Sequence, residues 1–238
     1  MPLMEAVHQA QPVGWVLVII YCVSVALGRA WMTGRPPFDL RPALVAWNAA
    51  LAAFSMMGFC IMTPHFVAVV WQHGMHGALC TRDRGQHFRS GQPGLWMFLF
   101  MLSKVPELLD TAFLVLRKRP VIFLHWYHHA SVLLYCWLAY GWRSNLGLVF
   151  ATMNYAVHSV MYAYYALAAA GRKPTWGSRV TLMQITQMIA GCSACAYAWV
   201  QGGAMCDNYY ALVAATVLYA SYLALFVKFF TQRDARSD

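Results

Sequence analysis

Charged residues are scarce in this sequence. Asp, Glu, Lys and Arg make up 11% of its 238 residues, whereas 61% are hydrophobic. An ordinary soluble domain carries about 25% charged residues. A chain with so little charge cannot cover a globular surface with polar groups, which excludes an ordinary water-soluble domain. The long apolar runs instead favour a helical bundle in a lipid bilayer.

The sequence also lacks features that would divide or target the chain. It has no internal repeat, no low-complexity tract and no long linker, so we expect residues 1–238 to form one integral-membrane domain. It has no Asn-x-Ser/Thr acceptor and no dilysine or KDEL-type ending, so its terminus does not indicate a compartment. The first apolar run lacks a basic start and a clear cleavage site, and we expect a retained span rather than a signal peptide.

The apolar runs predict an all-α membrane protein with seven transmembrane helices, because a span needs about 20 mainly apolar residues. The predicted spans are 13–32, 43–70, 94–116, 124–142, 146–169, 179–200 and 209–230. Pro64 lies near the end of the long second span, which we therefore expect to be tilted, kinked or broken. The polar, glycine-containing segment 73–93 is predicted to be a loop.

The net charge of +9 is unevenly distributed over the predicted loops. One side of the membrane collects Arg29, Arg35, Arg41, Arg117, Lys118, Arg119, Arg172, Lys173, Arg179, Lys228, Arg233 and Arg236, and the other has only Arg82, Arg84, Arg89 and Arg143. The positive-inside bias puts the first group in the cytosol, the N-terminus outside and the C-terminus in the cytosol. This distribution argues against a nucleic acid partner. It leaves open whether the basic loops set topology alone or also bind an anionic ligand, such as a phosphorylated carrier.

Cysteines divide between spans and loops. Of the seven, only Cys80 and Cys206 lie in predicted non-cytosolic loops. An oxidising lumen would allow these two to form a disulfide, which we take as the expectation. The other five lie in predicted spans, where a small apolar thiol is unremarkable.

Histidines cluster at the mouth of the predicted span 124–142. His125, His128 and His129 are three and four residues apart, which puts them on one helical face. An imidazole at the edge of a membrane span is costly and normally functional. Two chemistries suit such a cluster: metal ligation, or nucleophilic and acid–base catalysis.

Three further spans carry polar stripes. The third has Lys104, Glu107, Asp110 and Thr111 around Pro106, the fifth has Asn154, His158, Tyr162 and Tyr165, and the sixth has Thr181, Gln184 and Gln187. Ionisable groups in a span must pair with one another or line a wet interior, and a proline among them should bend the helix. A structural ion pair and interhelical hydrogen bonds are the simpler interpretations. One arrangement of the helices would keep all the stripes away from lipid, with every stripe turned towards a single polar chamber.

These stripes resemble the sequence boxes of the ELO family of very-long-chain fatty acid elongases. HWYHH at 125–129 matches HxxHH, KVPELLDT at 104–111 matches KxxExxDT, NYAVHSVMYAYY at 154–165 matches NxxxHxxMYxYY, and TLMQITQ at 181–187 matches TxxQxxQ. All four occur in the family's order, whereas the first 90 residues resemble it in hydropathy only. The residues around HWYHH and NYAVHSVMYAYY are most similar to those of the family branch that acts on saturated and monounsaturated palmitate-class acyl-CoAs.

The resemblance implies a 3-oxoacyl-CoA synthase, an acyltransferase of the endoplasmic reticulum membrane. Such an enzyme condenses acyl-CoA with malonyl-CoA to 3-oxoacyl-CoA, CO2 and CoA. The resemblance also implies seven helices around an enclosed acyl tunnel, with its cytosolic end open to CoA and with no bound cofactor or metal. The expected partners are both CoA substrates, membrane lipid and the other enzymes of the elongation cycle, and a homodimer is left open.

Following the family, we expect His128 to attack the acyl thioester in a ping-pong mechanism, because neutral imidazole is a competent acyl acceptor. His125, His129 and His158 would orient it, move protons and stabilise oxyanions, and Glu107 and Asp110 would fix Lys104. Substrate and CoA binding is expected from Lys104, Arg117, Lys118, Arg119, His125, Asn154, His158, Tyr162, Arg179, Thr181, Gln184 and Gln187.

Two other functions compete with this interpretation. A di-iron membrane desaturase or hydroxylase also uses HxxHH, but it needs about eight histidine ligands in three boxes, and one full box is present. A seven-helix transporter or receptor fits the number of spans. A transporter would commonly show repeated halves, which this sequence lacks.

Overall fold

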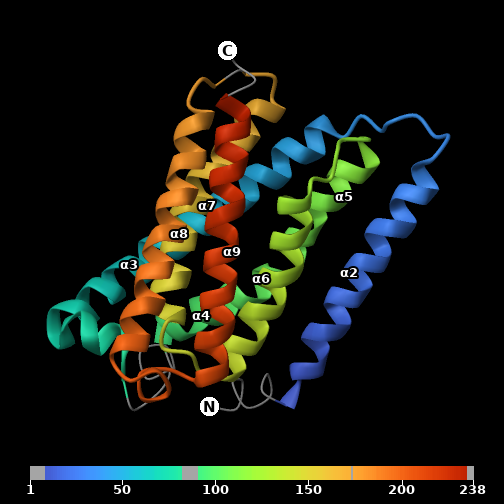
Figure 1. The fold of residues 1–238 in the computed structure, drawn as a ribbon. Helices are drawn as coiled ribbons and strands as arrows, with labels where there is room; N and C mark the ends of the chain where they lie inside the picture. Colours follow the sequence, from blue (N-terminus) through green and yellow to red (C-terminus); the bar gives the residue numbers. More distant parts are fainter. Residues whose placement is uncertain (1–8, 82–90, 173, 235–238) are drawn as a thin grey trace.

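The computed structural model describes residues 9–81, 91–172 and 174–234 (Figure 1). Within these ranges the fold is all-helical. The α-helices are α2 (Gln11–Met32), α3 (Arg41–Leu79), α4 (Gly91–Ser103), α5 (Leu109–Leu116), α6 (Phe123–Gly141), α7 (Gly147–Ala169), α8 (Gly177–Val200) and α9 (Tyr209–Asp234). Two short 3₁₀ helices are η2 (Pro106–Leu108) and η3 (Gly203–Met205). The predicted all-α class is confirmed.

Three of the described helices are long and apolar enough to cross a membrane by length and composition: Gln11–Met32, Arg41–Leu79 and Tyr209–Gln232. Helices α6, α7 and α8 are 19, 23 and 24 residues long, which is also sufficient in length. They carry polar stripes, which lower their mean hydropathy. The seven-span arrangement therefore stays a prediction.

Helix α3 departs from helical backbone geometry at Gly74 and is not broken at Pro64. The helix continues through Pro64 and ends at Leu79, so the first part of the predicted loop 73–93 is helical. Its non-helical residue is Gly74, with φ 68° and ψ 175°, a left-handed backbone that favours glycine. The chain turns there because a glycine can adopt this conformation, whereas a proline inside an apolar helix removes one hydrogen bond that neighbouring groups can replace.

The predicted span 94–116 is interrupted in the middle. Helix α4 ends at Ser103, η2 begins at Pro106, and α5 starts at Leu109. Pro106 has no backbone N–H and cannot continue the α-helical hydrogen bonding of the preceding turn. The expected bend at Pro106 is confirmed, and it redirects the side chains of this polar stripe.

Five helices form a closed ring. Helix α6 contacts α9, α9 contacts α8, α8 contacts α7, and α4 contacts both α7 and α6 (Figure 1). Helix α3 packs along α7, where Gly58 lies against the Tyr155 ring and a Cβ would collide with it. Helix α2 lies outside the ring, against α5 and α6. The ring encloses the interior that the polar stripes were expected to share.

A network of buried groups joins the loops at the end of the ring where α6 stops. Cys80 and Cys206 form a disulfide, with their Cα atoms 4.2 Å apart. Asp207, fully buried, accepts hydrogen bonds from Ser144 Oγ (2.6 Å) and the Asn145 backbone N–H (2.9 Å). Asn145 Nδ2 donates to the Cys206 carbonyl oxygen at 2.6 Å. We call these five residues the basal network. Burial raises the pKa of the Asp207 carboxyl, and its hydrogen bonds oppose that rise.

Removing the disulfide is expected to lower thermal stability. The bridge connects residues 126 apart in the chain, and a cross-link that closes a long loop stabilises a domain by roughly 2–5 kcal/mol. Cys80→Ala and Cys206→Ala should each lower the melting temperature in detergent by a similar amount, and the double variant by no more than either. Cys60→Ala, which removes an exposed free thiol on α3, is the matched control. Additive losses in the double variant would contradict a shared bridge.

Candidate active site

The three imidazoles of the HxxHH segment lie together on the first turns of α6. The His125 and His129 ring centroids are 4.4 Å apart, and those of His128 and His129 are 5.5 Å apart. His129 is buried, and the other two are half-buried. The predicted clustering of these histidines on one helical face is confirmed.

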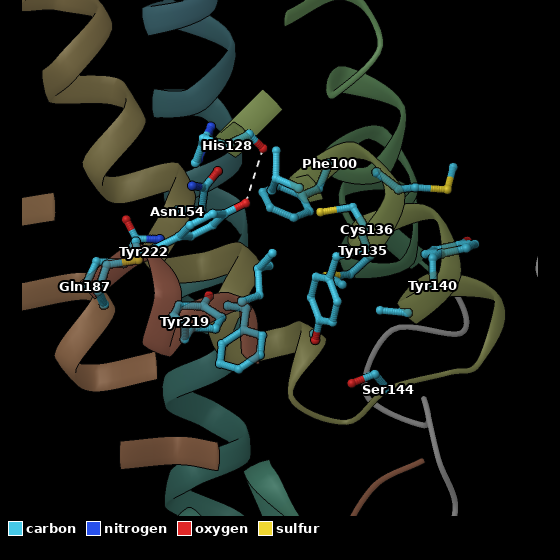
Figure 2. A pocket seen from close by; sticks show the side chains of 18 residues that line it. Phe100, His128, Tyr135, Cys136, Tyr140, Ser144, Asn154, Gln187, Tyr219 and Tyr222 are labelled. Atoms are coloured by element: carbon cyan, nitrogen blue, oxygen red, sulfur yellow. Dashed lines mark hydrogen bonds between the residues drawn. The ribbon is translucent and has the colours of Figure 1, made fainter. Parts of the chain in front are cut away.

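His128 is the histidine that faces the interior of the ring. Its ring centroid lies 5.0 Å from that of Tyr222 on α9, and the Tyr222 hydroxyl donates to the His128 carbonyl oxygen at 3.2 Å. Figure 2 shows His128 at one end of a pocket, near Asn154 and Tyr222, with Ser144 at the far end. His128 is therefore the imidazole with access to this cavity.

The cavity is mostly apolar and is lined by α4, α6, α7, α8 and α9. Asn154 contributes an amide near His128 and Gln187 a second amide beside Tyr222, while Ser144 lies at the far end (Figure 2). The wall below is built from aliphatic, sulfur-containing and aromatic side chains, among them Met97, Phe100, Met101, Val132, Tyr135, Cys136, Tyr140, Phe150, Leu218 and Tyr219. Such a wall suits a hydrocarbon chain with a polar head at the His128 end.

Lys104 and Glu107 form a buried ion pair beside this cavity. The Lys104 Nζ atom lies 2.8 Å from Glu107 Oε1, and their side chains are 2% and 4% exposed. The ammonium also donates to Asn154 Oδ1 at 3.2 Å, and Ser103 Oγ donates to Glu107 Oε1 at 2.9 Å. These contacts connect the α4–η2 junction to α7 and hold the amide of Asn154 at the cavity.

Asp110 belongs to a second group of contacts, separate from the Lys104–Glu107 pair. Its Oδ1 accepts from Trp47 Nε1 at 2.7 Å, and its Oδ2 accepts from the Tyr162 hydroxyl at 2.8 Å. His129 Nε2 lies 4.0 Å from the same Oδ2. Asp110 therefore orients groups around His129, and the expectation that it fixes Lys104 together with Glu107 is wrong.

His158 on α7 is buried next to the imidazole cluster. Its ring centroid lies 5.3 Å from that of Tyr162, whose hydroxyl donates to Asp110 beside His129. Helix α7 thus supplies Asn154, His158 and Tyr162 to the same region, one helical turn apart from each other. The predicted convergence of these three residues with the histidines of α6 is confirmed.

The cations of the expected CoA site lie apart from the imidazoles. Arg117 is half-buried, and Lys118, Arg119 and Arg179 are exposed. They follow α5 and begin α8, at the same end of the bundle as the start of α6 (Figure 1). Five other basic residues considered above lie outside the described residues: Arg82, Arg84, Arg89, Lys173 and Arg236.

The α8 stripe is divided between different environments. Gln187 lines the cavity, whereas Gln184 Nε2 contacts Met161 Sδ at 3.2 Å and the Thr181 hydroxyl donates to the Gly177 carbonyl within the helix. Tyr165, at the end of the α7 stripe, is exposed. Of these two stripes, only Asn154 and Gln187 line the cavity.

Sequence reasoning missed several residues that touch the site. Trp47 on α3 and Tyr21 on α2 reach it from apolar runs, and Tyr222 reaches it from α9. None of these three lies in a polar stripe of its own span, and aromatic residues in membrane spans are common. Only the packing of separate helices brings them to the histidines.

A protein metal site needs several ligating side chains gathered around one point. Among the residues for which the structure gives a position, no group of three or more His, Cys, Asp or Glu side chains is arranged to hold a metal ion. The nearest carboxylate to the α6 imidazoles in the contacts above is Asp110, and its two oxygens are already engaged by Trp47 and Tyr162.

Known proteins match almost the whole chain. The sequence profile of the GNS1/SUR4 (ELO) family covers residues 6–237. "Very long chain fatty acid elongase 6" of Homo sapiens is 41% identical over 216 residues, which is 89% of this chain and 80% of the human protein. The Drosophila melanogaster protein of the same name is 40% identical over 227 residues, which is 91% of this chain and 71% of its own length. "Fatty acid elongase 3" of Trypanosoma brucei brucei is 36% identical over 253 residues, covering 94% and 83% of the two chains.

These matches extend to the first 90 residues, where the sequence boxes gave no signal. They leave the desaturase, transporter and receptor interpretations without support. The family profile is that of the family which the four boxes resemble, and it spans all four. The chain belongs to the GNS1/SUR4 (ELO) family.

Proposed function

We propose that this chain is an acyltransferase that condenses a long-chain acyl-CoA with malonyl-CoA to 3-oxoacyl-CoA, CO2 and CoA. The family and the names of its relatives support fatty acid elongation. The observation that carries the proposal is the position of His128, the one cluster imidazole that lines an apolar cavity. An acyl chain in the cavity would present its thioester to this ring.

The length of the cavity supports an acyl chain as its occupant. On α6 the lining residues run from His128 to Tyr140, and at ~1.5 Å per residue this is about 18 Å. The hydrocarbon core of a bilayer is about 30 Å thick, so the acyl chain of a membrane lipid spans roughly half of that distance. The lining of the proposed tunnel therefore matches the length of an ordinary lipid chain, in line with the palmitate-class branch, and its side chains would have to move apart to widen the enclosed space of about 60 Å³.

The proposed reaction has two halves. A His128 nitrogen attacks the acyl-CoA thioester, the C–S bond breaks, and free CoA leaves with the proton of the ring. Malonyl-CoA then loses CO2, and its enolate carbon attacks the carbonyl of acyl-His128. The new C–C bond forms as the C–N bond breaks, and the departing ring nitrogen takes up one proton from solvent, which releases 3-oxoacyl-CoA and regenerates neutral His128.

The neighbouring groups have roles that fit their contacts. Lys104 and Asn154 form one polar surface near the cavity and would stabilise the malonyl carboxylate or the developing oxyanion. Tyr162 and Asp110 would orient His129, while His125 and His158 would move protons. Since Glu107 already neutralises Lys104, the binding of an anion there depends on hydrogen bonding as much as on charge.

The exposed cations suit the phosphates of CoA. Arg117, Lys118, Arg119 and Arg179 lie at the same end of the bundle as the imidazoles, where charge-assisted hydrogen bonds to phosphate would anchor the carrier. Thr181 and Gln184, on the first turns of α8, would contact the part of CoA between its phosphates and the thioester.

The membrane arrangement that we propose has seven spans: α2, α3, the segment α4–η2–α5, and α6 to α9. The whole chain forms one domain, with its N-terminus in the lumen of the endoplasmic reticulum and its C-terminus in the cytosol. The disulfide of the basal network suits an oxidising lumen. The other enzymes of the elongation cycle would receive the product, and a second copy of the chain remains open as a partner.

Purified protein incubated with acyl-CoAs of graded length and labelled malonyl-CoA is expected to release one CO2 per 3-oxoacyl-CoA formed. The products should be two carbons longer than the acyl substrate by mass spectrometry. Activity should persist in the presence of a chelator, which would distinguish condensation from an iron-dependent oxidation of the acyl chain. Hydrolysis of acyl-CoA without consumption of malonyl-CoA would contradict the proposal.

A further inference from the structure

Helix α2 contributes one buried hydroxyl to the site from outside the ring. Most of its apolar side chains are exposed, as expected for a surface that faces lipid. Its buried residues are Gly14, Tyr21 and Met32. Tyr21 is only 4% exposed, and it is the one of these three that carries a polar side chain. Its hydroxyl therefore needs a partner inside the protein.

That partner leads directly to the imidazole cluster. The Tyr21 hydroxyl lies 2.9 Å from Thr111 Oγ1, and Thr111 Oγ1 lies 2.9 Å from His125 Nε2. Thr111 is 1% exposed, so water does not compete for either contact. Three side chains from α2, α5 and α6 thus form one hydrogen-bonded chain that ends on a ring nitrogen of His125.

The direction of the two hydrogen bonds follows from the supply of donors and acceptors. A threonine hydroxyl donates one proton and accepts through its lone pairs, and so does a tyrosine hydroxyl. In the part of the chain that the structure covers, Thr111 is the only hydrogen-bond partner of the Tyr21 hydroxyl. If Thr111 donated to Tyr21, the buried Tyr21 proton would have no acceptor, which is costly. Tyr21 therefore donates to Thr111, and Thr111 donates to His125 Nε2.

An Nε2 atom that accepts a hydrogen bond carries no proton, so the proton of the neutral ring is on Nδ1. We propose that Tyr21 is a positioning residue that, through Thr111, holds His125 in its Nδ1-protonated tautomer beside His129. His125 then offers a hydrogen-bond donor to the cluster and keeps its orientation during the reaction. The importance of this tautomer for turnover rests on the proposed condensation, whereas the tautomer itself does not.

Tyr21→Phe tests this inference, because it keeps the ring and removes only the hydroxyl. In the full-length protein labelled with 15N-histidine, the His125 nitrogen signals should move from the Nδ1-protonated pattern towards a mixture of tautomers. A His125→Gln spectrum identifies these signals. The kcat for condensation should fall about ten-fold, since the loss of one oriented hydrogen bond is worth about that factor, with the KM for acyl-CoA unchanged.

Three further variants separate positioning from a loss of stability. Tyr155→Phe removes another buried hydroxyl, which donates to the Trp96 carbonyl at 2.9 Å, and should leave the His125 signals unchanged. Thr111→Ser retains the hydroxyl and should resemble the wild type, whereas Thr111→Val should reproduce the Tyr21→Phe spectrum. Unchanged His125 signals in Tyr21→Phe would overturn the inference. A tautomer shift in a protein that does not condense malonyl-CoA would leave it intact and refute the proposed function instead.

Discussion

His128→Ala is expected to abolish the covalent acyl-enzyme and to lower kcat by at least about 10⁴-fold, as removal of an essential nucleophile does in other acyl-transfer enzymes. Intact mass after incubation with acyl-CoA alone measures the adduct directly. The wild type should gain the mass of one acyl group, and peptide mapping should locate it on His128. The physical reason is access, because this ring lines the cavity while His129 is turned towards Asp110.

Two controls make this result specific. His76→Ala removes a histidine near the C-terminal end of α3, where its ring contacts the Tyr197 hydroxyl. This variant should retain both the adduct and the activity. His129→Gln should slow condensation but still permit acylation, because the nucleophile remains. An adduct of wild-type yield in His128→Ala, or no adduct in the wild type, would refute the assignment of His128 as the nucleophile.

Breaking the Lys104–Glu107 pair is expected to give the largest loss of stability. Lys104→Met leaves the Glu107 carboxylate buried with Ser103 as a remaining partner, and such an uncompensated charge costs about 3–5 kcal/mol. The double variant Lys104→Met/Glu107→Leu replaces both charges by apolar groups and should recover most of the lost melting temperature. Its condensing activity should stay absent, because the donor next to Asn154 is gone.

The pair Arg41–Asp39 provides the matched comparison. Its atoms are 3.8 Å apart and its side chains are 73% and 77% exposed. Exposed ion pairs contribute little, so Arg41→Met should leave the melting temperature almost unchanged. If the double variant at positions 104 and 107 recovered activity along with stability, the pair would have a structural role only.

The sequence predicted the helices and the polar stripes because both depend on local periodicity. Apolar runs located most helix ends to within a few residues, although α3 extends nine residues beyond its predicted end at residue 70, and the spacing of His125, His128 and His129 set their common face. It also led us to expect a bend at Pro106, where a missing N–H acts locally. At Pro64, where a tilt, kink or break was expected, α3 is not broken, and its non-helical residue is Gly74, which the sequence did not distinguish from the other glycines of the segment 73–93.

Contacts between distant residues could not be predicted in this way. Trp47 reaches Asp110 across 63 residues, and Tyr21 reaches Thr111 across 90. Trp47 has no polar neighbour three or four residues away and Tyr21 has only Ser24, so neither is distinguished from a lipid-facing aromatic residue by a polar stripe. The partition of Glu107 and Asp110 into two separate groups also depends on the break at η2, which changes the direction of the side chains after Pro106.

The basal network has a consequence for the order of events. Ser144 lines the end of the cavity away from His128, and its hydroxyl donates a hydrogen bond to the buried carboxylate of Asp207. In the proposed reaction, an acyl chain whose far end rests against Ser144 could leave only by moving back past the imidazoles. The elongated product would then have to withdraw before the next acyl-CoA binds, so only one chain at a time would occupy the cavity.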